Sequence, residues 1–312
     1  MPKVLITGGT GLVGKALTKK LLQKNYEVTV LTRDKSKAPA TPGINYAEWD
    51  INKQTIDEDA VISANHIIHL AGAGVAEKRW TKERKQEIID SRVKSGELLC
   101  NTLQKNNSNL QSFVSASAIG WYGPDPKIPN PNPFTEGLPY SNDYLGTTCH
   151  KWEQSVQPIK EMGKRLVILR TGIVLSNNGS ALKEFKKPLK FGVASVMGNG
   201  KQFVSWIHIE DLVDLYITAM ESEKYSGVYN AVAPAPVSNE HLITELANQT
   251  KGKFYTKMKV PTFILKAMLG EMSIEVLKST TVSAQKALDN YFQFKYPVIA
   301  AAITDLNKNT SK

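Results

Sequence analysis

KVLITGGTGLVG, residues 3–14, is the stretch that decides the fold of this 312-residue chain. The apolar run over 3–7 predicts a buried strand, and the glycines at 8, 11 and 14 stand between it and a helical pattern. In such a unit the first glycine permits a tight turn, the second lets a pyrophosphate approach the backbone, and the third lets helix and strand pack closely. Amides at the helix N-terminus then attract phosphate charge. The stretch therefore predicts a dinucleotide-binding unit.

The residues that follow extend this unit into an α/β fold. Further strands are predicted at 27–32, 66–71, 112–117 and 165–172. Helical periodicity separates them, at 14–24, 82–106 and 146–162. This alternation is typical of a Rossmann doubly wound parallel sheet with helices on both faces.

The chain is expected to divide into a large and a small domain. We predict an NADP-binding Rossmann domain over 1–235 and a small, mostly helical C-terminal domain on the substrate side over 236–312. Insertions at about 123–145 and 176–205 are expected to contribute to the substrate side. The first includes GPDPKIPNPNPFTEGLPY (123–140), whose six prolines exclude a regular helix or a central strand. Loops of this length inside a domain are usually functional or mobile.

Composition argues against several classes of protein. The net charge of +10 comes from lysines and arginines scattered along the chain, which favours a solvated basic surface over nucleic-acid binding. The two cysteines, Cys100 and Cys149, have no metal-ligand spacing, so no metal is expected. No run approaches the ~18 apolar residues of a membrane span. The N-terminus enters a strand pattern directly, without the features of a signal peptide, and we expect a cytoplasmic protein.

The end of the strand at 27–32 bears on the choice of cofactor. NAD enzymes often carry Asp or Glu there, to bond the ribose 2′-hydroxyl, whereas this strand ends Thr32-Arg33-Asp34. A guanidinium at Arg33 suits a 2′-phosphate through bidentate bonds and can stack on adenine. The pattern favours NADP(H) over NAD(H). In the alternative interpretation, Arg33 is a surface residue and Asp34 binds the ribose.

Longer blocks carry a family resemblance. TGGTGLVG (7–14), HLAG (69–72) and SASAIGWYG (115–123) resemble the extended branch of the short-chain dehydrogenase/reductase superfamily. The sequence is also similar to the atypical epimerase-family proteins within that branch, through AEKRWTKERKQEIIDSRV (76–93), LRTGIVLSNNGSALKEF (169–185), GNGKQFVSWIHIEDLV (198–213) and NAVAPAPVSNEH (230–241). The resemblance implies a Rossmann domain, a small C-terminal substrate-side domain and an NADP(H) site.

The resemblance also implies a set of cofactor contacts. They are Gly8, Thr10, Gly11, Leu12, Val13 and Gly14 in the glycine loop, Thr32, Arg33, Leu70, Ala71, Gly72 and Ser115 at strand ends, and Glu87 and Arg92 on the helix at 82–106. Without the resemblance, Arg92 and its basic neighbours form an ordinary solvated helix face.

Ser117 is the first catalytic candidate. It occupies the place of the serine that, in typical superfamily members, bonds the reacting carbonyl or hydroxyl. It lies at the C-terminal end of a predicted parallel strand, where ligands of open α/β sheets bind. A serine there could equally cap the next turn.

The proton-transfer pair of the superfamily is missing from its expected helix. Active members place Tyr and Lys four positions apart on one helix face, where the lysine lowers the pKa of the phenol. When YLGTTCHKWE (144–153) is aligned through Trp152-Glu153, the tyrosine slot falls on Leu145 and the lysine slot on Cys149. Neither side chain can perform this proton transfer. Tyr122 and Tyr144 are the reserve candidates for an acid.

Glu136, Asp143 and His208 are the other titratable candidates, and His208 is expected to bond locally at a strand-to-helix junction. Two functions remain open. The first is an NADP-dependent oxidoreductase or epimerase acting on a small or nucleotide-linked substrate. The second is a non-catalytic NADP(H)-binding sensor or partner-binding protein that keeps the nucleotide site without the proton-transfer pair.

Overall fold

An eight-stranded sheet forms the centre of the protein in this computed structural model, which describes residues 1–39, 41–179 and 181–308. The strand order is β12-β7-β6-β5-β1-β2-β3-β4, and every neighbouring pair is parallel except β3 and β4. The strands are β1 (Lys3–Thr7), β2 (Glu27–Thr32), β3 (Ile44–Asp50), β4 (Thr55–Ile56), β5 (His66–His69), β6 (Ser112–Ala118), β7 (Arg165–Thr171) and β12 (Gly227–Ala231).

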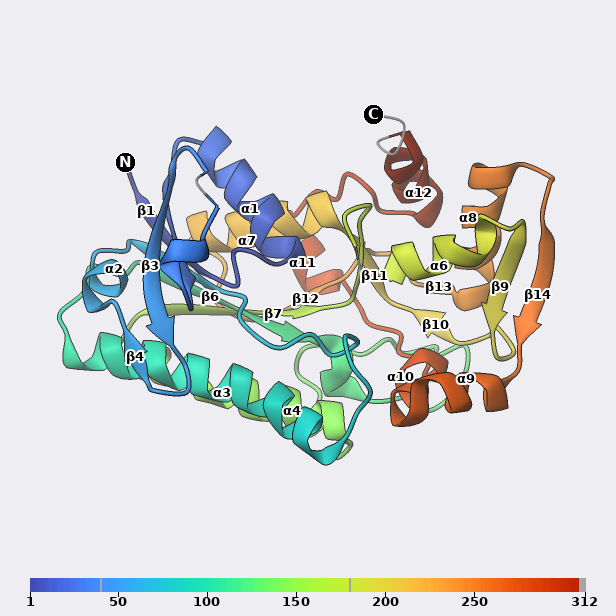
Figure 1. Ribbon diagram of the computed structural model, residues 1–312, viewed down its shortest axis with the longest axis horizontal. Coiled ribbons are helices and arrows are strands. Elements are labelled where there is room, and N and C mark those ends of the chain that lie inside the picture. The colour runs from blue at the N-terminus through green and yellow to red at the C-terminus, as the bar shows by residue number, and fades with distance from the viewer. Residues whose placement is uncertain (40, 180, 309–312) are drawn as a thin grey trace.

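Helices cover both faces of this sheet (Figure 1). One face carries α1 (Leu12–Gln23) and α7 (Ile209–Glu221), and the other carries α2 (Glu58–Ile62), α3 (Lys82–Lys105), α4 (Tyr144–Ser155) and α5 (Pro158–Glu161). Successive strand residues serve opposite faces, as a pleated strand requires: Val4 and Ile6 enter the core under α1, while Leu5 enters the core under α3. The predicted Rossmann doubly wound sheet is confirmed.

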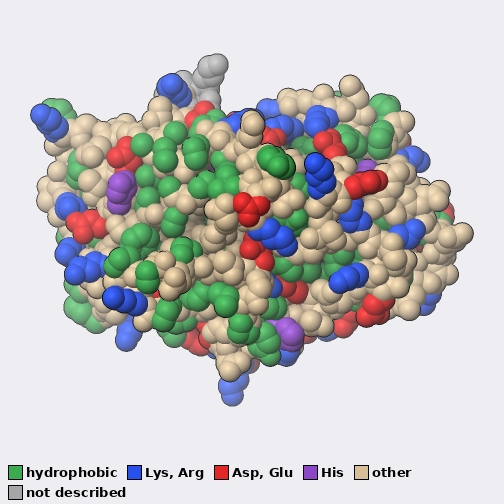
Figure 2. Space-filling model, turned by 180° about the vertical axis from the view of Figure 1, so that it is seen from behind, with side chains coloured by type: hydrophobic (Ala, Val, Ile, Leu, Met, Phe, Trp, Pro, Cys, Tyr) green, Lys and Arg blue, Asp and Glu red, His purple; other side chains and the backbone are tan. Residues whose placement is uncertain are grey.

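A second core lies in the C-terminal half. It joins residues between 175 and 206 to residues between 233 and 306, so two separate chain segments build one body. Its elements include α6 (Ala181–Leu189), β9 (Val193–Met197), α8 (Asn239–Lys251) and α12 (Ile299–Lys308), with β14 (Thr256–Val260) paired to β9. The mostly helical character of this region agrees with the sequence, while the boundary at 235 stays a prediction. Figure 2 shows hydrophobic side chains gathered over much of the back of this half.

The proline-rich segment 123–140 has no helix or strand, as the sequence predicts. Asp125 fastens it to the C-terminal part of the chain: its carboxylate accepts hydrogen bonds of 2.7 Å from the hydroxyls of Ser279 and Thr281. Phe134 forms an isolated parallel bridge with Val282 farther along. The loop is therefore fastened to residues 279–282.

Two details of the sequence prediction were wrong. The helix expected over 146–162 is two helices, because α4 ends at Ser155 and Pro158, which has no amide hydrogen, starts α5. Strands β3 and β12 were missed; β12 is only five residues long and contains Gly227 and Asn230, which are poor strand formers. In the part of the chain that the structure describes, no helix is both long and apolar enough to cross a membrane.

Candidate functional site

The glycine loop joins the C-terminal end of β1 to α1. Gly8 has a φ of +68°, and a Cβ on it would lie 3.0 Å from the backbone carbonyl of Leu70. A Cβ on Gly14 would lie only 2.3 Å from the Gly8 oxygen, so the helix can approach the loop only with glycine there. Gly11 is the N-cap of α1 and no side chain caps the helix, which leaves its first amides to a ligand. Thr10, Leu12 and Val13 line the same turn.

A hydrogen-bond chain behind this loop fixes the end of β5. The Thr7 hydroxyl oxygen accepts the amides of Leu70 and Ala71, both at 3.0 Å, so its own proton goes to Nδ1 of His69 at 2.8 Å. Nε2 of His69 is then the protonated nitrogen and faces the Ser95 hydroxyl at 3.3 Å. Burial lowers the pKa of His69 to about 3, which agrees with a neutral ring. Sequence reasoning missed these hydrogen bonds, although a histidine within an apolar strand could have indicated a buried polar partner.

The end of β2 separates the two interpretations of cofactor choice. The Asp34 carboxylate accepts hydrogen bonds from the amide and hydroxyl of Ser36, at 3.0 and 2.6 Å, and pairs with Lys37 at 2.8 Å. The hydrogen bond from Lys37 lowers the pKa of Asp34 to about 2. Arg33 is exposed and has no hydrogen bond or ion pair among the described residues, and Thr32 bonds only the backbone of Asp34. Asp34 therefore serves as a local cap, while the guanidinium of Arg33 is available.

Arg92 is a second cation without an acidic partner. Its side chain is 8% exposed, and its Nη1 donates to the carbonyls of Ala73 and Ile88, both at 2.9 Å. The guanidinium lies 4.8 Å from the Trp152 ring, and a Cβ on Gly72 would lie 3.0 Å from its Cζ. Within the described residues no carboxylate pairs with it, and burial lowers its pKa. A buried, unbalanced cation at the end of β5 is a place for an anion.

Glu87 and Ser115, two other residues in the expected cofactor set, are occupied differently. The Glu87 carboxylate is mostly exposed and pairs with Arg84 at 2.7 Å. Ser115 is buried on β6 next to His69 of β5, and its hydroxyl donates to the Ala116 carbonyl at 3.1 Å.

Ser117 belongs to a buried polar network at the ends of β6, β7 and β12. Its hydroxyl donates to the Glu153 carboxylate at 2.7 Å. Arg170 holds the same carboxylate in a two-point ion pair, at 2.8 and 2.9 Å, and also donates to the Tyr122 hydroxyl at 3.0 Å. Tyr122 in turn donates to Asn230 at 2.7 Å, and burial raises its pKa to about 12. Ser117 and Tyr122, both catalytic candidates, therefore use their protons within the network.

Sequence reasoning also missed most of this network. Ser117, Arg170 and Asn230 are direct neighbours in register on three strands, so their side chains leave the sheet on one face. Glu153 reaches them from α4. The available signal was an arginine within the apolar run RLVILRTG and a glutamate next to Trp152, because buried charges occur in pairs.

Helix α4 shows what fills the two slots of the missing pair. Leu145 packs on Gly120, where an added Cβ would lie 3.1 Å from the leucine Cβ. Cys149 is buried, its thiol faces the Ala118 carbonyl at 3.5 Å, and burial raises its pKa to about 12. Tyr144 turns toward α3, donating to the Lys85 carbonyl at 3.0 Å, and burial raises its pKa.

The remaining titratable candidates serve local structure. Asp143 caps α4 through the Gly146 amide at 2.7 Å, and His208 accepts the Glu210 amide at 3.2 Å as the cap of α7, as its position predicted. Glu136 accepts the Asn230 amide at 2.9 Å. Among the described residues, no cluster of acidic, histidine or cysteine side chains has a metal-binding arrangement.

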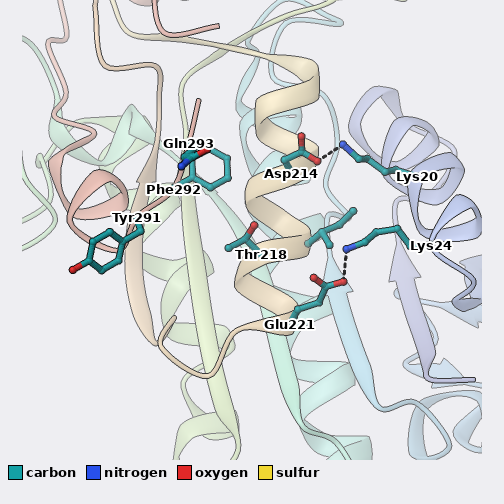
Figure 3. A pocket seen from close by; sticks show the side chains of 9 residues that line it. Lys20, Lys24, Asp214, Thr218, Glu221, Tyr291, Phe292 and Gln293 are labelled. Carbon is teal, nitrogen blue, oxygen red and sulfur yellow. Dashed lines mark hydrogen bonds and ion pairs between the residues drawn. The ribbon is translucent and has the colours of Figure 1, made fainter. Parts of the chain in front are cut away.

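A hollow of about 300 Å³ between α1, α7 and residues 291–293 lies apart from this site (Figure 3). Its lysines are already neutralised: Lys20 pairs with Asp214, and Lys24 pairs with Glu221 at 2.7 Å. Paired charges leave this hollow with little to attract an ionic ligand.

Known proteins resemble the chain over its whole length. The family model described as NAD dependent epimerase/dehydratase family matches residues 4–231, and a domain of unknown function matches 260–306. An epimerase family protein of Staphylococcus saprophyticus is 35% identical over 309 residues, covering 98% of this chain and 99% of the relative.

Two solved structures are similar as well. Human epimerase family protein SDR39U1 (isoform 2), solved with NADPH, is 25% identical with a TM-score of 0.84, over 98% of this chain and 99% of the human one. A nucleoside-diphosphate sugar epimerase from Corynebacterium glutamicum is 30% identical with a TM-score of 0.77, over 99% of this chain and 59% of that one.

Proposed function

Because the chain belongs to the NAD dependent epimerase/dehydratase family, we propose that it binds NADP(H) at the carboxyl edge of its sheet and acts as an oxidoreductase or epimerase. The proposed substrate is a small or nucleotide-linked molecule. The bound nicotinamide supplies hydride transfer at its C4 carbon, and the protein supplies binding and orientation.

The end of β2 carries the preference for NADP(H). Both oxygens of Asp34 are occupied by Ser36 and Lys37, so that carboxylate is poorly placed to bond a ribose hydroxyl. Arg33, next to it, is exposed and unpaired within the described chain, and its fork of donors suits a 2′-phosphate. The human relative was solved with NADPH, which points the same way.

The other groups have separate tasks in this proposal. The uncapped first turn of α1 bonds the pyrophosphate, with Gly8 and Gly14 giving the loop its shape. The chain through Thr7, His69 and Ser95 holds the backbone at Leu70 and Ala71, against which the cofactor lies. Arg92 attracts negative charge to the end of β5.

The proton-transfer step of this reaction cannot follow the usual path. Leu145 and Cys149 fill the slots of tyrosine and lysine, and the hydroxyls of Ser117 and Tyr122 are committed to Glu153 and Asn230. In this proposal the proton comes from the substrate or from solvent. The same observation favours the second candidate, a non-catalytic NADP(H)-binding sensor, because binding needs none of these groups.

Cofactor preference is tested by titrating the purified protein with NADPH and NADH. We expect NADPH to bind at least about tenfold more tightly, the effect of one favourable charged contact of about 1.4 kcal/mol. Arg33→Glu is expected to erase or invert this ratio. Lys160→Glu, an exposed lysine on α5, makes the same change of charge elsewhere and should leave the ratio intact. Equal wild-type affinities for the two cofactors would refute the role of Arg33.

A label-transfer experiment with NADPH that carries deuterium at C4 distinguishes an enzyme from a non-catalytic sensor. The labelled complex is incubated with a panel of nucleotide-linked keto sugars, whose carbonyl carbon can accept the deuteride from C4 of the nicotinamide, and the label is followed by mass spectrometry. Movement of deuterium into a sugar supports the enzyme, and Tyr144→Phe should not reduce the rate, because that phenol is turned toward α3. Tight NADPH binding with the label retained against every sugar, including those that bind, supports the sensor.

A further inference from the structure

The connection between β2 and β3 lacks the helix that a doubly wound sheet normally places there. Residues 33–43 contain, in their described part, only the short turn η1 (Lys35–Lys37). Strands β1, β2 and β3 are parallel neighbours in that order, so right-handed connections put this segment on the same face as α1. The sheet beside α1 is therefore left partly uncovered.

A hollow of about 460 Å³ occupies this space, and we call it the crossover groove. Val30, Ile44 and Tyr46 of β2 and β3 form its floor, and Leu22 of α1 forms part of its wall. Ile44, Tyr46 and Leu22 pack on the main core yet remain only partly buried. A hollow of this size and apolar character lies within the range of small-molecule pockets, which is about 300–1,000 Å³.

Cations line the rim of the crossover groove. Lys15, Thr18, Lys19 and Leu22 are spaced three and four residues apart along α1, so they share one helix face. Lys15 and Lys19 are exposed, and neither has an ion pair or hydrogen bond in the described part of the chain. The hollow in Figure 3 differs in this respect, because its lysines are neutralised by Asp214 and Glu221.

Thr18 supplies an independent sign of a missing ligand. Its side chain is only 4% exposed and lines the groove, yet its hydroxyl has no hydrogen-bond partner among the described residues. Buried hydroxyls are almost always bonded, and an unbonded one costs free energy. A threonine in a helix can bond the carbonyl four residues back, as Thr102 does with Leu98 at 2.9 Å.

From these features we propose that the crossover groove binds a small amphipathic anion, a carboxylate with an apolar body. The body lies on Val30, Ile44 and Tyr46, and the carboxylate pairs with Lys15 and Lys19. The Thr18 oxygen is covered in the unliganded groove, so in this proposal the side chain turns about χ1 to donate its hydroxyl proton to the carboxylate. The groove is continuous with the glycine loop, since Gly9 and Thr10 line its upper end and a Cβ on Gly9 would lie 2.7 Å from Val30. Thr10 of the glycine loop lies at one end of the groove, whereas Lys15, Lys19 and the apolar floor are not among the residues proposed to hold the dinucleotide.

Octanoate is the probe for this site, and displacement of the fluorescent anion 1-anilinonaphthalene-8-sulfonate reports its binding. The double variant Lys15→Glu/Lys19→Glu is expected to weaken octanoate binding at least about tenfold, because two attractive charges become repulsive. Lys160→Glu/Lys183→Glu makes the same change of charge at two exposed lysines on α5 and α6, which have no ion pair within the described residues, and should leave binding unchanged. Equal losses in both double variants would overturn the proposal.

Two further measurements distinguish binding in the groove from binding at other apolar surfaces. Phe263 is 70% exposed on α9 (Thr262–Leu269), and Phe263→Ser should leave octanoate affinity unchanged. A loss of affinity in this variant would show that octanoate binds near Phe263 and would overturn the proposal. Octanoate is also titrated with the protein saturated by NADPH. Retained binding supports a separate site, whereas full competition by NADPH would assign the groove to the dinucleotide and overturn the proposal. Octanoate binding in a protein that fails to bind NADPH would leave this site intact and refute only the proposed function.

Discussion

Two regions of the same sheet edge are built in opposite ways. At β2 and β5, Arg33 and Arg92 have no acidic partner among the described residues, and the first turn of α1 has no side-chain cap. At β6, β7 and β12, Arg170 is held by Glu153, and their neighbours bond one another. The first region has positive charge available for a ligand, while the polar groups of the second region bond one another. A guanidinium thus has two different uses within one fold, and this difference can be tested.

Arg170→Leu is expected to give the largest effect. It leaves Glu153 buried at 5% side-chain exposure without its cation, and breaking a buried pair in this way costs about 3–5 kcal/mol of unfolding free energy. Urea denaturation without cofactor measures the loss. The double variant Glu153→Met/Arg170→Leu removes both charges and should recover most of it. A single variant as stable as wild type would show that the network does not hold the fold together.

Arg92→Leu sharpens the comparison, because here the loss should appear in binding rather than folding. Within the described residues the guanidinium bonds two carbonyls and contacts a ring face, and the loss of these contacts is offset by removal of a buried charge that has no acidic partner there. Unfolding free energy is therefore expected to change by less than about 1 kcal/mol. NADPH affinity is expected to fall about 10- to 100-fold, the value of one charged contact. Lys94→Leu, two residues along α3 in an exposed pair with Asp90, is the control. A large loss of stability with unchanged affinity would place Arg92 in the structural class of Arg170.

The sequence predicts the first region far better than the second. KVLITGGTGLVG encodes a backbone shape, and backbone shape depends on residues that are neighbours in the chain, so its turn and helix start could be read directly. The network at Ser117 joins β6, η2 (Ile119–Tyr122), α4, β7 and β12, and such contacts exist only after the sheet is assembled. The slots at Leu145 and Cys149 could be placed by counting along one helix, whereas the bonding of Ser117 could not.

The hydrogen-bonded His69, on the cofactor side, is expected to make the unfolding free energy depend on pH. Its folded pKa of about 3 lies below the usual 6.5, so below pH 6.5 the unfolded state takes up a proton that the folded state does not. Stability is therefore expected to fall as pH decreases from about 6.5 toward 4, with a limiting slope of about 1.4 kcal/mol per pH unit. His69→Gln should flatten the profile of unfolding free energy against pH, and replacing the exposed His241 serves as the control. If the variant and the wild type had the same dependence of unfolding free energy on pH, the neutral, hydrogen-bonded state of the His69 ring would be contradicted.

Thr18→Val tests whether the unbonded Thr18 hydroxyl lowers the stability of the free protein and strengthens the binding of a ligand. Valine keeps the shape of threonine and removes a buried hydroxyl that has no partner in the described chain, so unfolding free energy is expected to rise by about 1 kcal/mol. Thr102→Val is the matched control: Thr102 is also 4% exposed in a helix, but its hydroxyl bonds Leu98, so its loss should lower stability. Urea midpoints at constant m measure both changes. Because the groove hydroxyl is proposed to bond a carboxylate, the Thr18 variant should bind octanoate more weakly while being more stable, and a gain in both would remove Thr18 from the site.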